Sequence, residues 1–361
     1  MNPSPTPQKA PRMEWLYSMP GFTMILVVAF HVGKDGFMLP TEQSASQPLL
    51  QLFRMPLFFF ISGFLAYRVS EAWSLRRLAT LLGKKLRIQV VPTLVFFTLF
   101  IVIVRGMNGH SWWYFFWSPF KSGYWFTIAL LYMFIVYYVF AYLESLLKRR
   151  SWVPVALLFA LAVAAYQSCY LPQWFSWGMG RRGEVNEWVI NSSLRQAMLF
   201  FPFFVLGNIF HRYRPQAARL LDSRWFFPAM VLLAVVCLME FFQWKILRMG
   251  WRSVPLTLSR LSLLMIVLAS FRHYAPSLTK AHIVGRTLQF VGRRTLDVYL
   301  LHFFFIPHLP GVGDFFRANG GNFLGEVVAT TTVGVVVVAF CLLVSAALRV
   351  SPFLTKQLFG R

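Results

Sequence analysis

Charged side chains are scarce in this chain of 361 residues, at only 13% of the total. A water-soluble protein typically carries about 25%, whereas 57% of the residues here are hydrophobic and 18% are aromatic. These proportions exclude an ordinary soluble protein. Cysteine is also rare, and the spacing of the three residues matches neither a disulfide framework nor a zinc site. They are Cys169, Cys237 and Cys341. The sequence further lacks a serine nucleophile elbow, a phosphate-binding glycine loop, a metal motif, an internal repeat and a soluble domain boundary.

Long apolar runs fill most of the sequence. A helix of about 20 residues crosses a hydrocarbon core of about 30 Å, and about ten runs approach that length. We place them at 14–33, 49–67, 88–104, 122–143, 152–169, 196–210, 225–244, 254–271, 288–307 and 326–348. The sequence therefore predicts an all-α, polytopic membrane helical bundle. Residues 1–13 are expected to form a disordered tail, 14–348 a single transmembrane domain and 349–361 a cytoplasmic tail.

Basic residues outnumber acidic ones by 35 to 12, which gives a net charge of +23. When both termini are set in the cytoplasm, the inner segments carry 23 of the Lys and Arg residues and the outer segments carry 10. Because Lys and Arg accumulate in cytoplasmic loops, this asymmetry predicts that both termini are cytoplasmic. Topology and contact with anionic membrane lipids account for the basicity. Nucleic acid is therefore not expected as a partner.

Three short segments carry further structural signals. In residues 70–87, Leu recurs at helical spacing on one face, and Arg and Lys lie on the other. This pattern predicts an amphipathic helix on the inner surface or an extension of the second or third span. Residues 111–117, SWWYFFW, predict a helix or turn in the outer aromatic belt. Ser62 and Gly63 form a small-residue patch at which another helix can approach closely.

Ionisable residues inside the spans are the strongest functional signal, because each costs about 2.5–3.5 kcal/mol at the centre of a spanning helix. His31, Arg54, Glu240, Arg260 and His302 come from five helices. At 1.5 Å per residue, all five lie between about 3 and 9 Å below the outer edge. Their common depth predicts one polar cavity that opens to the outer side. The alternative is a set of buried salt bridges, such as Glu240 with Arg54 or Arg260, that hold the bundle together.

Two features concern the ninth span. Thr295, Tyr299 and His302 recur at i, i+4 and i+7 and form one polar stripe that is expected to face the cavity. Asp297 follows Arg293 and Arg294 by four and three residues. We expect a local ion pair between them and not a catalytic role for Asp297.

These residue types fit two kinds of chemistry. Histidine suits removal of a proton near neutral pH, and a nearby carboxylate can orient its ring. A histidine base beside arginines fits acyl transfer, in which the base takes a hydroxyl proton and the cations stabilise an oxyanion or hold an anionic donor. Histidine, arginine and glutamate at one depth also fit a proton-coupled transporter. Composition does not separate these two classes.

Five stretches resemble one known family of membrane proteins. They are LVVAFHVG around His31, FRMPLFFFISGFL at 53–65, the pair Trp125-Phe126, FFPFFVLGNIF at 200–210 and RRTLDVYLLH at 293–302. Together they resemble acyltransferase family 3, whose members have about ten spans and move acyl groups from cytoplasmic acyl-CoA to hydroxyls of extracytoplasmic or membrane-associated glycans. The second stretch is the most specific and is most similar to the subgroup that includes the periplasmic glucan succinyltransferases.

The resemblance implies roles for individual residues. The family's first-helix histidine, its proposed catalytic base, falls on His31, and a late Tyr-Leu-x-His element falls on Tyr299 to His302. One position departs from the pattern, because the family commonly has Arg or Lys eleven residues before the first histidine and this chain has Pro20. Arg54 and Arg260 are the candidates for the missing cation. This substitution bears on binding of the acyl donor more than on the fold.

We therefore predict an integral-membrane O-acyltransferase of a bacterial inner membrane that moves an acetyl or succinyl group from acyl-CoA to a glycan or glycolipid hydroxyl at the outer side. Acyl-CoA would be the donor substrate, with no metal and no bound cofactor. The expected catalytic residues are His31 and Glu240. The expected substrate-binding residues are Arg54, Trp125, Arg260, Tyr299 and His302. The alternative is a transporter or exporter of an anionic glycan or lipid intermediate. The sequence gives no prediction of the oligomeric state.

Overall fold

The computed structural model describes residues 14–67, 73–147, 152–170, 187–241, 253–320 and 322–351, together with Thr355 and Leu358. For residues 240, 241 and 253 it describes the backbone alone. These residues form helices and no strand, which confirms the all-α prediction. The predicted tail at 1–13 lies outside the described residues, as does most of the predicted tail at 349–361.

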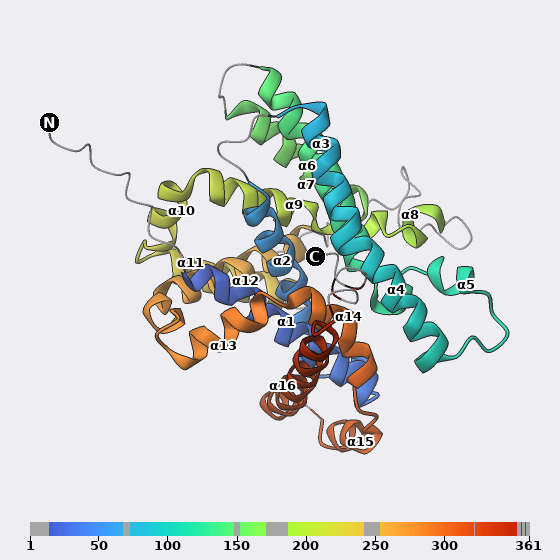
Figure 1. Cartoon of the computed structure of the whole chain (residues 1–361). Coiled ribbons are helices and arrows are strands. Elements are labelled where there is room, and N and C mark those ends of the chain that lie inside the picture. The colour runs from blue at the N-terminus through green and yellow to red at the C-terminus, as the bar shows by residue number, and fades with distance from the viewer. Residues whose placement is uncertain are drawn as a thin grey trace, which may run out of the picture.

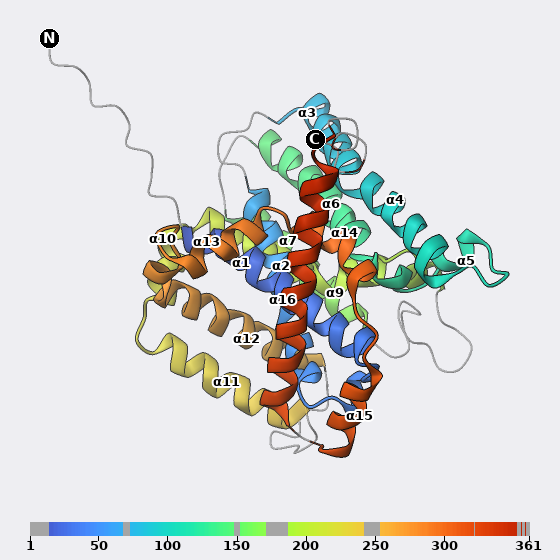
Figure 2. The ribbon, with the colours of Figure 1, turned by 60° about the horizontal axis from the view of Figure 1, so that its bottom comes forward.

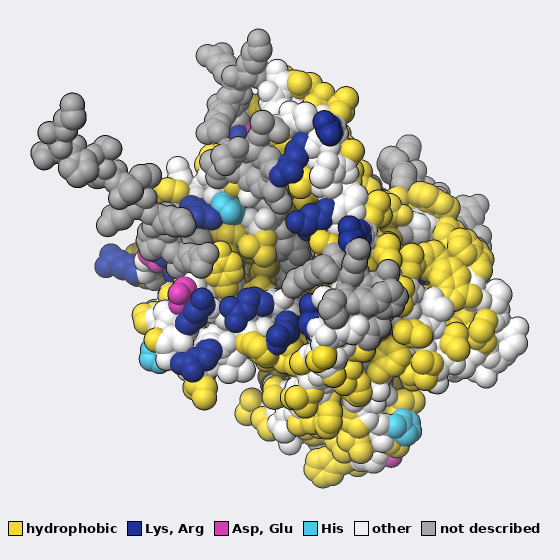
Figure 3. Space-filling model, in the orientation of Figure 1, with side chains coloured by type: hydrophobic (Ala, Val, Ile, Leu, Met, Phe, Trp, Pro, Cys, Tyr) yellow, Lys and Arg dark blue, Asp and Glu magenta, His cyan; other side chains and the backbone are white. Residues whose placement is uncertain are grey.

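Six helical segments among the described residues are long and apolar enough to cross a membrane. They are α1 (Glu14–His31) with η1 (Val32–Gly36), α2 (Gln47–Ala66), the run of α3 (Leu75–Lys85), η3 (Leu86–Val90), α4 (Val91–Phe100) and η4 (Ile101–Arg105), α6 (Phe126–Leu146), α12 (Ser253–His273) and α16 (Phe323–Leu348). A pair bent by 76°, α10 (Arg214–Leu221) and α11 (Phe226–Phe241), gives a seventh segment if it counts as one span. Hydrophobic side chains cover much of the face seen in Figure 3, as expected of an integral membrane protein.

The remaining helices are shorter or less apolar. They are η2 (Thr41–Gln43), α5 (Trp112–Phe116), η5 (Lys121–Gly123), α7 (Val153–Ser168), α8 (Glu187–Asn191), α9 (Leu194–Arg212), η6 (Ala275–Leu278), α13 (Ile283–Gly292), α14 (Thr295–Phe305) and α15 (Pro310–Ala318). Of these, α5 matches the helix or turn predicted from the aromatic run at 111–117. Both α7 and α14 are apolar but only 16 and 11 residues long.

Two predicted spans have different bounds in the structure. The segment 70–87 continues into the third span, so that one helical run extends from Leu75 to Arg105. The ninth span, predicted as 288–307, is broken because the chain leaves helical geometry at Arg294, where φ is −119° and ψ is 21°. The break lets α13 pack across α1 through Gly21, where an added Cβ would lie 2.0 Å from the carbonyl oxygen of Leu288.

The first two spans form the centre of the bundle (Figure 1). In their most apolar stretches, 67% of α1 residues and 61% of α2 residues are buried, compared with 28% for α16. Helices α13, α14 and α16 pack along α1, and α9 and α12 pack along α2. Figure 2 shows α16 running along the outside of the bundle, with α15 near one of its ends and the C-terminus near the other. The residues that end α1 and begin α2 are therefore held between packed helices.

The predicted small-residue patch on α2 is where α9 approaches most closely. A Cβ added at Gly63 would lie 1.8 Å from the carbonyl oxygen of Phe204, and one added at Gly207 would lie 1.9 Å from that of Phe60. The two glycines thus let the backbones of α2 and α9 come into direct contact, as small residues do in membrane helix pairs. This contact fixes the axial position of α2, the helix that carries Arg54.

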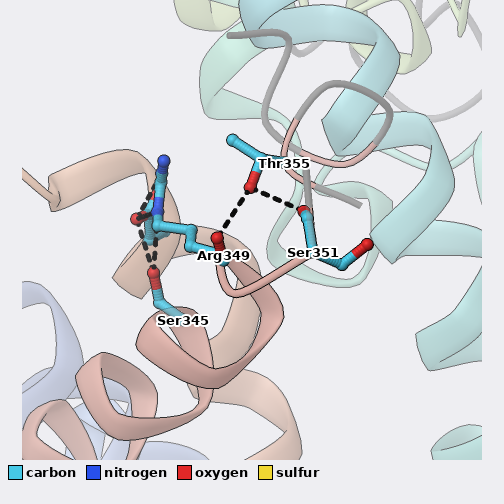
Figure 4. Close-up of polar contacts among 5 residues, drawn as sticks. Ser345, Arg349, Ser351 and Thr355 are labelled. Carbon is cyan, nitrogen blue, oxygen red and sulfur yellow. Dashed lines mark hydrogen bonds and ion pairs between the residues drawn. The ribbon is translucent and has the colours of Figure 1, made fainter. Parts of the chain in front are cut away.

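The buried carboxylate of Asp297 joins α14 to the end of α16, which corrects the expected ion pair with Arg293 and Arg294. Nη2 of Arg349 lies 2.8 and 2.7 Å from the two oxygens of this carboxylate, and the hydroxyl of Ser345 donates to it at 2.7 Å. The carbonyl of Arg349 in turn accepts a hydrogen bond from Thr355 (Figure 4). The partner, Arg349, lies about fifty residues later in the chain, at the end of α16. Residue spacing within one span cannot predict such a contact between two helices.

We predict that Gly63→Ala destabilises the protein, whereas Gly83→Ala does not. Overpacking a tight interface typically costs about 1–3 kcal/mol, and the Phe204 backbone that meets the new methyl group cannot move as a side chain would. A Cβ at Gly83 on α3 meets no atom within 4 Å, so this matched substitution reports the change in helix propensity alone. Thermal unfolding in detergent measures both. Equal unfolding temperatures for the two variants would contradict the close α2–α9 contact.

A second prediction concerns the pair of Asp297 and Arg349. Loss of one member of a buried pair leaves an uncompensated charge and costs roughly 3–5 kcal/mol, so Asp297→Asn and Arg349→Met should each lower the unfolding temperature by several degrees. The double variant should lose less than the sum of the two single losses. Arg293→Met serves as the control, and a loss in this variant as large as that in Arg349→Met would mean that the pairing is wrong.

Candidate functional site

His31 is the last residue of α1, and the chain continues as one π-helical turn, η1. This turn ends with the amide of Phe37 donating to the carbonyl of Val32 at 2.7 Å. It brings Oδ2 of Asp35 to 2.8 Å from Nδ1 of His31. Since a carboxylate only accepts, Nδ1 carries the proton and Nε2 keeps its lone pair. The ring is thus oriented as a general base, as in other histidine-carboxylate pairs.

The loop that follows His31 is fixed by a buried carboxylate at the start of α16. Glu326, which is 2% exposed, accepts hydrogen bonds from the hydroxyls of Ser44 and Ser46 at 2.6 and 2.9 Å. It also accepts from the backbone amides of Ala45 and Ser46, both at 2.9 Å, at the N-terminal end of α2. A carboxylate in this position satisfies amides that a helix start leaves without partners. It therefore holds α2 at a fixed place relative to the His31 turn.

A second histidine lies beside the first. The ring centroids of His31 and His302 are 5.2 Å apart, and the ring of Phe303 lies 4.7 Å from that of His31. Nδ1 of His302 lies 2.8 Å from the carbonyl oxygen of Tyr299 and 3.1 Å from that of Val298. His302 is fully buried, and its Nε2 has no hydrogen-bond partner among the described residues.

Arg54 approaches the same site from α2. Its guanidinium carbon lies 3.8 Å from the ring centroid of Phe30, and that ring lies 5.1 Å from the ring of His31. Arg54 is only 7% exposed, and Nε and Nη1 have no hydrogen-bond partner within the described parts of the chain. A buried guanidinium with free N–H groups is suited to hold an anion. The structure thus brings together three of the five residues predicted to share one depth.

Arg260 belongs to a different polar group. Its Nη1 donates to the hydroxyls of Tyr166 on α7 and of Tyr170 just after this helix, at 3.1 and 3.2 Å. Its guanidinium lies 5.9 Å from the ring of Phe200, on which Trp125 stacks at 6.0 Å. The predicted binding residues Arg260 and Trp125 therefore flank one phenylalanine.

Glu240 is part of α11, but its side chain lies outside the described residues. The predicted pairing of this carboxylate with Arg54 or Arg260 therefore stays a prediction.

A cavity of about 230 Å³ lies below the two histidines, toward the start of α1 and α14. It is lined by Pro20, Phe58, Ile61, Ser62, Leu65, Ala66, Lys85, Gln89, Phe126, Thr127, Leu130, Phe134, Tyr138, Gly292, Thr295, Leu296 and Tyr299. The predicted polar stripe on α14 therefore divides, because Thr295 and Tyr299 line the cavity and His302, one turn later, contacts His31. Pro20 precedes His31 by eleven residues on α1, or about 16 Å along the helix.

Basic residues surround this cavity. Lys85 lines it, and Arg293 and Arg294 lie between the lining residues Gly292 and Thr295. Figure 3 shows Lys and Arg side chains gathered over α3 and α13, on the face towards the viewer. In the predicted orientation this face is cytoplasmic. Such a concentration of positive charge attracts polyanionic ligands to the cavity.

Comparison with known families gives a match. The model of a family described as "Acyltransferase domain" matches residues 14–348, nearly all of the described chain. The chain belongs to acyltransferase family 3. Membership makes it a membrane acyltransferase. Neither a curated protein nor a solved structure matches the chain significantly.

Within this family 3 acyltransferase, Asp35 is the site residue that the sequence reasoning missed. Its position four residues after His31, in HVGKD, is the signal that could have found it, since residues at i and i+4 meet on one helical face. The apolar run predicts a first span that ends at residue 33, whereas helical geometry continues to Gly36 and includes Asp35. Among the described residues, no group of three His, Cys, Asp or Glu side chains is placed to hold a metal ion.

The segment before α6 supports the α14 side of the acyltransferase site. The carbonyl of Gly123 accepts a hydrogen bond from the hydroxyl of Tyr299 at 3.3 Å, and the hydroxyl of Tyr124 donates to the carbonyl of Leu300 at 2.9 Å. Lys121 anchors this segment because its Nζ donates to the carbonyls of Ser118 and Asn191. Burial lowers the pKa of Lys121 to about 8, since the charged ammonium loses its hydration.

This shift predicts that the cost of burying the charged Lys121 ammonium disappears as the pH rises. In the unfolded chain the lysine pKa is 10.5, so the unfolded state binds more protons than the folded state between about pH 8 and 10.5, and stability rises with pH in that range. The unfolding temperature of the wild type should therefore rise relative to that of Lys121→Met from pH 8 to pH 10. A difference that does not change with pH would show that Lys121 titrates normally.

Proposed function

We propose that this acyltransferase moves an acetyl or succinyl group from acyl-CoA to a hydroxyl of a glycan or glycolipid at the outer side of the membrane, with His31 as the general base. The observation that carries the proposal is the 2.8 Å contact of His31 with Asp35, beside buried nitrogens that have no hydrogen-bond partner among the described residues: Nε and Nη1 of Arg54 and Nε2 of His302. A proton-coupled transporter could use the same histidine, carboxylate and arginine, and it is membership of acyltransferase family 3 that favours acyl transfer.

The reaction follows from these positions. Nε2 of His31 takes the proton of the acceptor hydroxyl while the hydroxyl oxygen attacks the thioester carbonyl, and Asp35 stabilises the imidazolium that forms. Negative charge develops on the former carbonyl oxygen, and the free Nε–H and Nη1–H groups of Arg54 are suited to stabilise it. Collapse of this intermediate breaks the carbon–sulfur bond, and the imidazolium returns its proton to the thiolate of CoA.

The two substrates would reach His31 from opposite sides. Asp35 is 43% exposed and His31 17% exposed in their side chains, so a hydroxyl has access from the end of α1. The cavity below Tyr299 supports entry of the acyl donor from the other side, where Lys85, Arg293 and Arg294 would attract the phosphates of CoA. These arginines and the unpaired Arg54 supply positive charge in a chain that has Pro20 in place of the family's cation.

The remaining predicted residues have supporting roles in this proposal. Arg260, with its two tyrosines and the stacked pair of Trp125 and Phe200, would bind the glycan or an anionic group on it, because aromatic faces and guanidinium groups suit such ligands. Tyr299 would position the donor at the upper end of the cavity, and Glu240 would pair with an arginine. We further propose a bacterial inner membrane as the location and the glucan succinyltransferases as the nearest subgroup.

The test is acyl transfer by the purified protein. Acetyl-CoA and succinyl-CoA are supplied with periplasmic and surface glycans from the expressing bacterium, and mass spectrometry reports the acylated product. His31→Ala should reduce the rate by at least about 10²-fold, the lower end of the contribution of general-base catalysis. Asp35→Asn should also reduce it strongly, because the wrong ring tautomer becomes available.

The matched control is His110→Ala, which removes an exposed histidine that stacks on Tyr114. This variant should keep full activity, and thermal unfolding should show that all three variants are folded. CoA should also stabilise the wild type against heat. Full activity of His31→Ala, or substrate movement without any use of acyl-CoA, would refute the proposal, and the second result would favour the transporter.

A further inference from the structure

His302 has a fixed tautomer that leaves one lone pair unused. Both atoms near its Nδ1, the carbonyl oxygens of Val298 and Tyr299, are acceptors, so Nδ1 carries the proton. Nε2 is therefore a hydrogen-bond acceptor, and it finds no donor among the described residues. A buried acceptor without a partner typically costs about 1–3 kcal/mol. A ligand that brings an N–H or O–H group to this atom would recover that energy.

The burial of the surrounding groups indicates the side from which this ligand comes. Side-chain exposure falls from 43% at Asp35 to 17% at His31, and His302 is 0% exposed. The ring centroid of Phe303 lies 3.9 Å from that of His302 and 4.7 Å from that of His31, so this phenylalanine packs against both histidines. On the opposite side, Tyr299 precedes His302 by less than one turn and lines the cavity. Because the cavity comes within one helical turn of His302, we take the ligand of Nε2 to be the substrate that enters through this cavity.

We propose that Nε2 of His302 accepts a hydrogen bond from the amide N–H of the acyl donor that is nearest to its thioester. This inference rests on the proposed function, in which the donor is an acyl-CoA. Only two methylene groups separate that nitrogen from the sulfur, so an amide held by His302 places the thioester next to His31, whose ring centroid is 5.2 Å away. His302 is then a donor-positioning residue, and it takes no part in proton transfer.

The experiment uses two donors that differ in one N–H group. One is acetyl-CoA, or succinyl-CoA if only that donor supports transfer, and the other is the same molecule with the amide nearest the sulfur replaced by an ester. The dissociation constant of each is measured with the full-length wild type and with two variants. His302→Asn keeps an amide near the position of Nδ1, where it can still donate to the helix carbonyls, but has no atom at Nε2. His302→Gln instead reaches the position of Nε2.

We expect the wild type to bind the amide donor roughly 3- to 10-fold more tightly than the ester donor, the usual value of one hydrogen bond. His302→Asn should bind the two donors equally, and His302→Gln should keep part of the preference. Unfolding temperatures check that both variants are folded. An equal affinity of the wild type for both donors, or an unchanged preference in His302→Asn, would overturn the inference.

The outcomes also separate this inference from the proposed function. If acyl transfer depends on His31 but the wild type binds both donors equally, the role of His302 is overturned and the proposed function stands. No use of acyl-CoA at all would overturn both. A purely structural role for His302 makes two different predictions. His302→Gln, which loses the bond to the helix carbonyls, would destabilise the protein more than His302→Asn does. Neither variant would alter the ratio of the affinities for the amide donor and the ester donor.

Discussion

The apolar interior of this bundle requires each buried polar group to find its partner within the protein, and most of the described polar groups do so. Asp297 is held by Arg349 and Ser345, and Glu326 receives four hydrogen bonds from the loop that starts α2. Among the described residues, Nε2 of the fully buried His302 and Nε and Nη1 of Arg54 lack hydrogen-bond partners, and such groups are costly unless a ligand completes them. Both lie around His31, and the contact of His31 with Asp35 distinguishes this cluster from the one at Arg260, whose Nε also lacks a described partner.

Helix α2 connects the packing of the bundle to this site. Its Gly63 contacts the backbone of α9, its Ser62 lines the cavity, and its Arg54 reaches the ring next to His31. Because one rigid helix carries all three, a shift of α2 by a fraction of a turn would alter the packing, the cavity and the cation together. Glu326 limits such a shift by holding the start of α2. The packing contact of Gly63 with α9 and the position of Arg54 near His31 therefore depend on each other.

Much of this site could be predicted from the sequence, because a spanning helix turns position along the chain into depth. His31, Arg54 and His302 share one depth by counting residues, and the structure does bring them together. Depth says nothing of which helices are neighbours, so the separate placement of Arg260 with two tyrosines was not predictable. The partner of Asp297 was missed for the same reason. Asp35 lies beyond the apolar run, and apolar patterning does not reveal that the chain continues through a π-helical turn.

The position of the cavity also removes a difficulty in the proposed chemistry. A span is about 30 Å long, and an acyl donor confined to one face of the membrane could not reach a base near the other. The cavity begins near Pro20 and continues up to Tyr299, and His302 follows three residues later, a rise of about 4.5 Å. In the proposed reaction, the donor's arm would have to pass about one helical turn of packed side chains beyond Tyr299 to bring its thioester to His31. Over so short a path the proposed reaction needs no covalent acyl-enzyme relay, and the burial of His302 would help to keep water away from the thioester.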